Sequence, residues 1–428
     1  MKYLNTKSKT KNFRERGFIA FFIIFPITAI IFGIAASVFT LTYNEQKIIQ
    51  NIVKSAQAYY AAEGGVEDII LRLKKNKNWS SPYILNVGDG STTVEVSDII
   101  GGSRTITSSG GVSDRIRKIQ AAYSISSDEV AFHYGAQIGD GGLKMSASSV
   151  IRGNVFSNGS IVPESSGRGT IDNDVYVAYN GNKIEGVNIG GDAYAFTFQD
   201  CNVVGDIYYV SGGSVSGCPA GGAVNIRPNQ VDSRLMPISD SQISSWKNEA
   251  ASGGIMGSIN SSANLNLGPV KIEGNLRIYG NGTLTIQGTI WVTGNLTFEN
   301  NAEIKLNPSY YGNSGMIIAD GKVLLQNNAE LEGSGQPGSY LMVLSANNSV
   351  DEFSPAFRVK NNTEGDVIFY ASNGLMVLEN NAELREATAY KLFLKDNVEV
   401  NYQTGLQDAS FSSGPGGSWK VVSWGEVE

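Results

Sequence analysis

The chain has little of the chemistry on which most enzymes and metalloproteins depend. Its 428 residues include one histidine and two cysteines, and only 17% of them are charged. A single histidine excludes zinc sites built on two histidines, and the lack of a CxxC motif excludes the common cysteine sites. No GxSxG, HExxH or P-loop sequence is present. We therefore expect no metal, no cofactor and no enzymatic activity.

Basic residues are concentrated at the N-terminus. Residues 1–17 carry a charge of about +5, which leaves about −12 on the rest of a chain whose net charge is −7. The β-rich body has no basic patch with interleaved aromatic residues, so nucleic acid is not an expected partner.

An uncharged apolar run follows this basic leader, over residues 18–42. About 20 apolar residues span a bilayer as a helix, so we predict a transmembrane helix there. The positive-inside rule places the N-terminus in the cytoplasm and residues after about 45 outside it. The alternative is a secretory signal peptide that is cleaved near Ala35–Ser37.

Helical periodicity continues beyond the apolar run. Apolar residues recur every three or four positions, which predicts an amphipathic extension of the same helix over 43–80. Gly64 and Gly65 interrupt it, and each should cost about 1 kcal/mol relative to alanine in a helix interior. Either another backbone approaches or the helix bends at this point, or the helix is partly melted there. Alternating strands over 83–127 then predict a small sheet packed on the end of the helix.

The remainder, 130–428, combines the chain's many glycines and asparagines with short apolar strands. One helix is expected near 239–251, capped by Ser239 or Asp240. Strand repeats share a polar corner, as in "LTFENNAEIKL" and "VLLQNNAELEG", and the corner asparagines are Asn301, Asn328, Asn362, Asn381 and Asn397. Recurring corners favour a β-helix or β-solenoid, with a two-sheet sandwich as the alternative. The predicted class is thus α+β overall: a long N-terminal helix, a small β-sheet and a large all-β domain.

Few residues in the β-rich body are candidates for chemistry. Cys201 and Cys218 either form a disulfide, closing a loop of about 17 residues, or remain two buried thiols. His133 lies in an alternating stretch and is predicted to be an ordinary strand histidine. A β-helical carbohydrate-active enzyme would need paired carboxylates, and the candidates are Asp140, Asp172, Asp174 and Asp192. Alternation predicts Asp172 and Asp174 on one strand face.

The N-terminal residues resemble a known family. "RERGFIAFFIIFPITAIIFGIAA" is similar to the leader and helix of a type IV prepilin, in which a basic stretch and a glycine precede phenylalanine. The resemblance implies cleavage by a prepilin peptidase between Gly17 and Phe18. The stretch containing Gln57, Ala61, Ala62 and Glu63 resembles the N-terminal domain of PilX-type minor pilins. About 60 residues carry this resemblance.

One residue departs from the family pattern and bears on the expected role. Most prepilins have glutamate at the fifth position of the mature helix, where this chain has Phe22. The departure favours a minor, capping or tip position over repeated incorporation along a fibre.

We thus expect a membrane-inserted minor pilin-like subunit of a type IV pilus or pseudopilus. It would display its β-domain outside the cytoplasm for adhesion or assembly. The implied partners are the lipid bilayer, other pilin-like subunits, the prepilin peptidase and a surface polysaccharide or a host or substrate surface. The alternatives are a permanently anchored surface adhesin and the β-helical enzyme.

Overall fold

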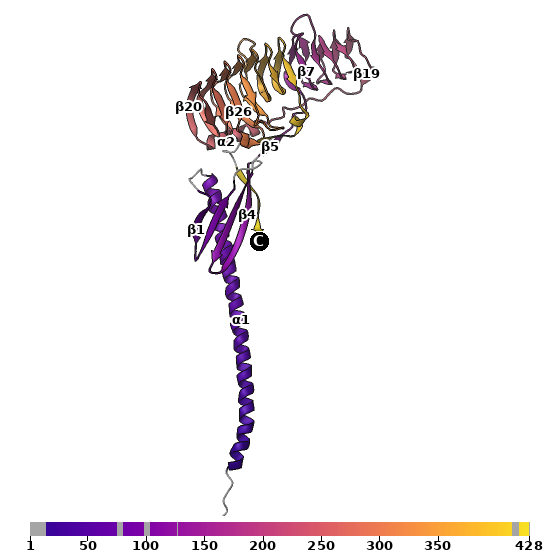
Figure 1. The fold of residues 1–428 in the computed structure, drawn as a ribbon. Coiled ribbons are helices and arrows are strands. Elements are labelled where there is room, and N and C mark those ends of the chain that lie inside the picture. Colours follow the sequence, from indigo (N-terminus) through magenta and orange to yellow (C-terminus); the bar gives the residue numbers. More distant parts are fainter. Residues whose placement is uncertain (1–13, 75–79, 98–102, 126, 413–418, 428) are drawn as a thin grey trace, which may run out of the picture. The chain divides into compact units, whose positions relative to one another are not determined.

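The structure is a computed structural model that describes residues 14–74, 80–97, 103–125, 127–412 and 419–427. Its contacts divide the chain into two compact units. The first contains the N-terminal helix, most of a small sheet and the last residues from Trp424, and the second contains Ala122–Ser423 together with Ser97–Thr105. The predicted order, a long N-terminal helix followed by a β-rich body, is confirmed (Figure 1).

The first unit is built on one helix, α1 (Arg14–Lys74), which continues without interruption through Pro26 and the Gly64–Gly65 pair. It ends before the predicted boundary at residue 80, because Ser80 is no longer helical and 75–79 lie outside the described residues. The strands of its sheet are β1 (Tyr83–Val87), β2 (Gly90–Val96), β3 (Ser103–Val112), β4 (Arg115–Ile125) and β38 (Trp419–Val427).

The small sheet includes the C-terminus, which the sequence analysis assigned to the large β-domain. The strand order is β1-β2-β3-β4-β38, so a strand near residue 420 is the edge neighbour of β4. Arg117 of β4 and Glu426 of β38 form an ion pair at 2.5 Å. The predicted domain 130–428 is therefore wrong at its C-terminal end. The large domain is an insertion between two neighbouring strands of the small sheet.

The second unit is a stack of parallel strands. Its N-terminal part contains β6 (Ala136–Met145), β7 (Val150–Arg152), β8 (Val155–Ser157), β9 (Ile161–Pro163), β10 (Gly169–Ile171), β11 (Val175–Val177), β12 (Lys183–Glu185), β13 (Val187–Ile189), β14 (Ala193–Tyr194), β15 (Thr197–Gln199), β16 (Asn202–Val203), β17 (Ile207–Val210), β18 (Ser214–Ser216) and β19 (Val224–Arg227). Its C-terminal part contains β20 (Ile255–Ser261), β21 (Leu265–Leu267), β22 (Val270–Tyr279), β23 (Thr283–Ile286), β24 (Ile290–Val292), β25 (Leu296–Glu299), β26 (Glu303–Leu306), β27 (Gly315–Ala319), β28 (Val323–Gln326), β29 (Glu330–Glu332), β30 (Leu341–Ser345), β31 (Phe357–Lys360), β32 (Glu364–Gly365), β33 (Val367–Leu378), β34 (Glu383–Leu384), β35 (Glu386–Leu394) and β36 (Glu399–Asn401).

We call the strands that lie at one level of the stack a rung, and a rung contains up to three strands. The rung β24, β25 and β26 pairs in parallel with β27, β28 and β29, and these pair in the same way with β30, β31 and β32. Inward-facing residues of all rungs form one continuous apolar core. Because each rung repeats the register of its neighbour, like residues lie above one another along the stack.

The first strand of the stack in sequence order lies in the middle of the stack. The first strand, β6, pairs on one side with β35 and on the other with β8 and β9. From β6 the rungs proceed outward to β19, and a connection over 228–239 then returns along the stack to α2 (Asp240–Ser252) and β20 at the opposite end (Figure 1). The remaining rungs lead back from β20 to β35.

A second apolar cluster covers the outside of one face of the stack. Ile243 and Trp246 of α2 pack with outward-facing residues such as Ile318 and Tyr370. The helix begins after Ser239, whose side chain forms a capping box with Gln242. An antiparallel pair, β5 (Ser127–Val130) and β37 (Ala409–Ser412), lies where the chain enters and leaves the unit, and two short 3₁₀ helices are η1 (Pro308–Tyr310) and η2 (Thr404–Asp408).

Candidate functional sites

The surface of α1 is apolar and exposed over much of its length. Large side chains from Phe21 to Val53 are uncovered, with exposed fractions that reach 77% at Phe32. The most apolar window has a mean hydropathy of 2.5 and none of it is buried. By length and composition, α1 can cross a membrane. Gly17 and Phe18, the predicted cleavage residues, lie near the start of α1.

The sheet of the first unit covers the C-terminal part of α1. Ala58, Ala61 and Ala62 are buried, as are Val66 and Ile69. The predicted pilin-like motif therefore divides in two, because its alanines form the contact with the sheet while Gln57 is exposed and Glu63 half-buried. Small side chains at this spacing allow strands to pack close to the helix backbone.

Gly65 is a point of close approach between helix and sheet. A Cβ atom at Gly65 would lie 2.4 Å from Ser108 Oγ, 2.7 Å from Thr92 Cγ2 and 2.8 Å from Val94 Cγ2. Thr92 and Ser108 share a buried hydrogen bond of 2.7 Å beneath it. Gly64 differs, since its nearest neighbours would be the Val87 methyl groups at an ordinary 3.5 Å. Gly65 is thus a place of close approach, but side chains of the sheet and not a second backbone come near it. The helix is not interrupted at Gly64.

A glycine on the sheet side matches this arrangement. A Cβ at Gly110 would lie 2.1 Å from the carbonyl oxygen of Ala58 and 2.4 Å from the amide nitrogen of Ala62. Polar contacts fix the same junction further along, where Asp68 accepts hydrogen bonds from Arg72 Nε at 2.6 Å and from the Tyr83 hydroxyl at 2.8 Å. The close approach of Gly110 to the helix backbone and the hydrogen bonds of Asp68 thus hold the sheet against α1.

The predicted corner asparagines form a ladder along the stack. The Nδ2 atom of each donates to the Oδ1 atom of the preceding one, at distances of 3.1, 3.1, 2.8 and 3.1 Å from Asn301 through Asn328, Asn362 and Asn381 to Asn397. All five have positive φ angles of 60 to 64°. Asparagine tolerates this conformation because its short side-chain amide can form hydrogen bonds with nearby backbone groups.

A second asparagine ladder runs beside the first and was missed by the sequence analysis. Asn300, Asn327, Asn361 and Asn380 also have positive φ angles, and their amides are linked at 2.9, 2.7 and 2.8 Å. The signal was present, because each corner is an Asn-Asn pair in all four cases. Two adjacent left-handed residues turn the chain sharply, and stacked amides satisfy the polar groups that the turn exposes.

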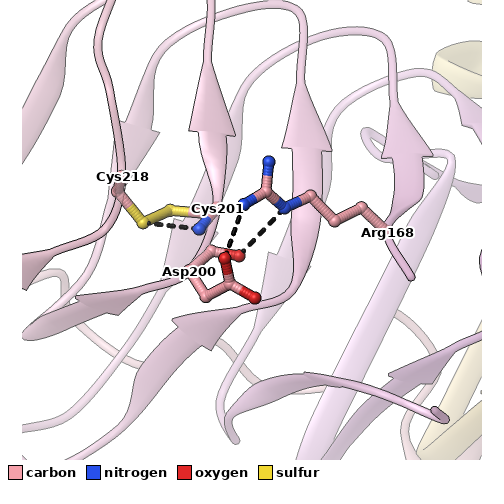
Figure 2. Close-up of a disulfide and its surroundings, with 4 residues drawn as sticks. All are labelled: Arg168, Asp200, Cys201 and Cys218. Carbon is pink, nitrogen blue, oxygen red and sulfur yellow. Dashed lines mark hydrogen bonds and ion pairs between the residues drawn. A yellow bond between two sulfur atoms is a disulfide. The ribbon is translucent and has the colours of Figure 1, made fainter. Parts of the chain in front are cut away.

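Cys201 and Cys218 form a disulfide (Figure 2). Cys201 follows β15 and Cys218 follows β18, so the bond joins two successive rungs near the β19 end of the stack. Both residues belong to the apolar core, and Cys201 N donates a 2.8 Å hydrogen bond to Cys218 Sγ. Beside them, Arg168 donates to the side chain of Asp200 at 2.5 Å and to its carbonyl oxygen at 3.2 Å.

The carboxylates proposed for an enzyme do not share a strand face. Asp172 and Asp174 both lie in the turn between β10 and β11, which corrects the predicted strand placement. Asp172 pairs with Arg152 at 3.3 Å, whereas Asp174 Oδ1 accepts the backbone amide of Asp192 at 2.9 Å. Asp140 is exposed in β6. Asp174 and Asp192 thus accept backbone amides at corner turns, and Asp172 forms a surface ion pair.

The prediction for His133 also requires correction, because this residue is exposed and lies between β5 and β6, outside any strand. It lines a groove of about 740 Å³ on the outer face of the N-terminal rungs. Tyr176 and Tyr194 form one side of this groove. Their rings, from successive rungs, stack with centroids 4.8 Å apart.

Comparison with known proteins leaves the family open. No family model matches the chain, and no curated protein is similar to it. Among solved structures it is similar to the crystal structure of the competence-associated pilin ComZ from Thermus thermophilus, at 10% identity and a TM-score of 0.20. The similarity covers 87% of this chain and 97% of that one. At this TM-score the likeness carries no argument about function.

Proposed function

We propose that the chain is a pilin-like subunit of a type IV pilus or related pseudopilus. The observation that carries the proposal is the division of α1 into two parts. From Phe21 to Val53 its apolar surface is exposed, and from Ala58 onward the small sheet covers it. Such a helix can reside in the bilayer and afterwards bury the same surface among the helices of neighbouring subunits, because both environments remove apolar side chains from water.

The finer features of the proposal come from the sequence. Phe22 in place of the family's glutamate supports a minor position, and the alanine-rich motif supports a PilX-type N-terminal domain. The prepilin peptidase would cleave between Gly17 and Phe18. The N-terminus would lie in the cytoplasm, and the second unit would be displayed outside the cell membrane. Neither nucleic acid nor a catalytic role is part of the proposal.

The second unit is proposed to be a β-solenoid that serves adhesion or assembly. Parallel rungs in register and the two asparagine ladders support this architecture. A solenoid suits display, because each added rung lengthens the domain without a new core design. Its partner would be a surface polysaccharide or a host or substrate surface.

Mass spectrometry of the native N-terminus tests the pilin proposal. We expect a mature chain that begins at Phe18. A Gly17→Leu variant should retain the leader, whereas Gly33→Leu should be processed normally, since a side chain at Gly33 meets nothing within 4 Å. An intact Met1 in the membrane-inserted protein would overturn the proposal.

A second measurement separates a fibre subunit from a permanently anchored adhesin. Shearing of cells releases surface fibres but leaves membrane proteins behind. We expect the processed chain in the sheared fraction together with other pilin-like subunits. Recovery of the processed chain only in the membrane fraction would favour the anchored adhesin.

A further inference from the structure

Most arginines of the second unit are paired with a carboxylate. Between residues 130 and 412 the sequence has seven arginines, and five of them form salt bridges: Arg152, Arg168, Arg277, Arg358 and Arg385. The exceptions are Arg227 and Arg234. Among the residues that the structure describes, neither has a carboxylate partner, and both line the groove on the outer face of the N-terminal rungs.

The groove lies between the stack and the connection that follows β19. We call residues 228–239 the strap. Gln230 Nε2 donates to the carbonyl oxygen of Tyr179 at 2.8 Å, and Gln137 Nε2 donates to that of Leu235 at 2.7 Å. These two hydrogen bonds hold the strap to the stack at residues 230 and 235, at the two ends of the segment that lines the groove.

Aromatic side chains from three rungs form its floor. Phe156, Tyr176 and Tyr194 lie in register on β8, β11 and β14. These strands are paired on both sides within the stack, so the floor has no free strand edge. Phe156 is buried, and the atoms that a ligand can reach are the ring edges and hydroxyl groups of Tyr176 and Tyr194. An extended peptide would find no backbone partners on it, whereas a sugar can contact aromatic carbon and hydrogen-bond with phenolic hydroxyl groups.

The two guanidinium groups mark the ends of this floor. Arg234 Cζ lies 5.4 Å from the centre of the Phe156 ring, and Arg227 Cζ lies 5.3 Å from that of Tyr194. Phe156 and Tyr194 are two rungs apart, which corresponds to about 10 Å. Two cations held against rings of different rungs suit a ligand with anionic groups repeated along its length.

From this geometry we propose that the groove binds a linear acidic polysaccharide whose sugar rings carry carboxylates. Arg227 and Arg234 each bind one carboxylate, and the sugars between them lie along the half-buried rings of Tyr176 and Tyr194. Phe156 is buried and supports Arg234 from beneath. Asp232 and His133, which line the same groove, have no hydrogen-bond or salt-bridge partner among the described residues and are free to bind sugar hydroxyls. This assigns a ligand class to the adhesive role proposed above.

Binding to defined oligomers tests the assignment. The full chain in detergent micelles is titrated calorimetrically with oligomers of galacturonic, mannuronic and glucuronic acid, and with their methyl esters, which keep the rings but lose the charge. We expect at least one acid to bind and its ester to bind at least about tenfold more weakly, because a charge-assisted hydrogen bond contributes that much. Added salt should weaken the acid alone.

Substitutions locate the site. Arg227→Gln and Arg234→Gln should each reduce affinity for the acid at least about tenfold. Arg168→Gln is the matched control, because Arg168 is a salt-bridged arginine of the same unit that does not line the groove. Its affinity should equal that of the wild type.

Three outcomes would overturn the proposal. They are failure of all three acids to bind, equal binding of acid and ester, and unchanged affinity in the Arg227→Gln, Arg234→Gln double variant. Oligoglutamate that binds as tightly as the best uronate would show that the ligand is not a saccharide. The N-terminal mass that decides the pilin proposal is unaffected by any of these results, so the two proposals fail separately.

Discussion

Replacing the two adjacent glycines of α1 by alanine, one at a time, should change the stability of the first unit in opposite directions. Both substitutions gain about 1 kcal/mol from helix propensity. At Gly64 little opposes this gain, since the new methyl group meets only Val87 at 3.5 Å. Gly64→Ala should therefore stabilise the contact between α1 and its sheet by about 1 kcal/mol.

At Gly65 the gain is outweighed. The methyl group would fall within 3.0 Å of Ser108, Thr92 and Val94. Thr92 and Val94 are β-branched and cannot rotate away freely, so overpacking should cost about 2 kcal/mol. Displacing Ser108 also breaks its hydrogen bond to Thr92, at a cost of about 1 kcal/mol. The net effect of Gly65→Ala is a destabilisation of about 2 kcal/mol.

Native-state hydrogen exchange, read by mass spectrometry on peptides from β2 and β3, measures this local stability directly. Protection should fall roughly 30-fold in Gly65→Ala and rise about fivefold in Gly64→Ala. Peptides from β24 to β32 in the second unit serve as an internal control and should not change. If Gly65→Ala raised protection as Gly64→Ala does, the proposed close approach at Gly65 would be refuted.

Three further predictions concern the second unit. Asn328→Ala removes two side-chain hydrogen bonds of the ladder and leaves alanine at a φ of 61°, which alanine adopts less readily than asparagine. Denaturant unfolding should therefore show a loss of about 3 kcal/mol, and Asn328→Gly should lose less because glycine accepts that angle. Reduction of the Cys201–Cys218 disulfide should lower stability by about 3 kcal/mol in the chain-entropy model and expose β18 and β19 first, with unchanged exchange there as the contrary result. Glu386 is fully buried, and burial raises its pKa well above 4.5 in the folded chain, although a hydrogen bond from Thr388 opposes this. The folded state then holds a proton that the unfolded state releases, so the contribution of Glu386 to stability is present below pH 4.5 and is lost as pH rises toward the folded pKa. Glu386→Gln should abolish that loss, and a thermal midpoint with the same pH profile as the wild type would contradict this reasoning.

The sequence predicted correctly those elements that depend on residues close together in the chain. The length and polarity of 18–42 predict an apolar helix, because an uncharged run of that length has few other stable environments. The Asn-Asn pairs predict tight corners, because left-handed backbone angles depend on the residue itself. Ser239 was a correct candidate for the N-cap of α2 for the same reason, since capping involves only the first turn.

Other features depended on contacts between distant residues. The sequence contains no signal that β38 pairs with β4. A short edge strand has the same residue pattern whether it ends the large domain or completes the sheet of the small one. Nor could periodicity show that β6 stacks on β35, which places the first strand of the unit in the middle of its stack. Rungs of one type can pair in many orders, and only the packed core selects one.

The sequence by itself determined that this protein has an apolar N-terminal helix and a β-rich body with asparagine corners. The tertiary structure alone decided that β38 pairs with β4 and which side chains share a surface. Arg227 and Arg234 stand among ordinary loop residues in the sequence, and Phe156 and Tyr194 lie many residues away. Stacking rungs of unequal length and folding the strap back over them brought these four together in one groove, because parallel pairing aligns residues by rung and not by distance along the chain.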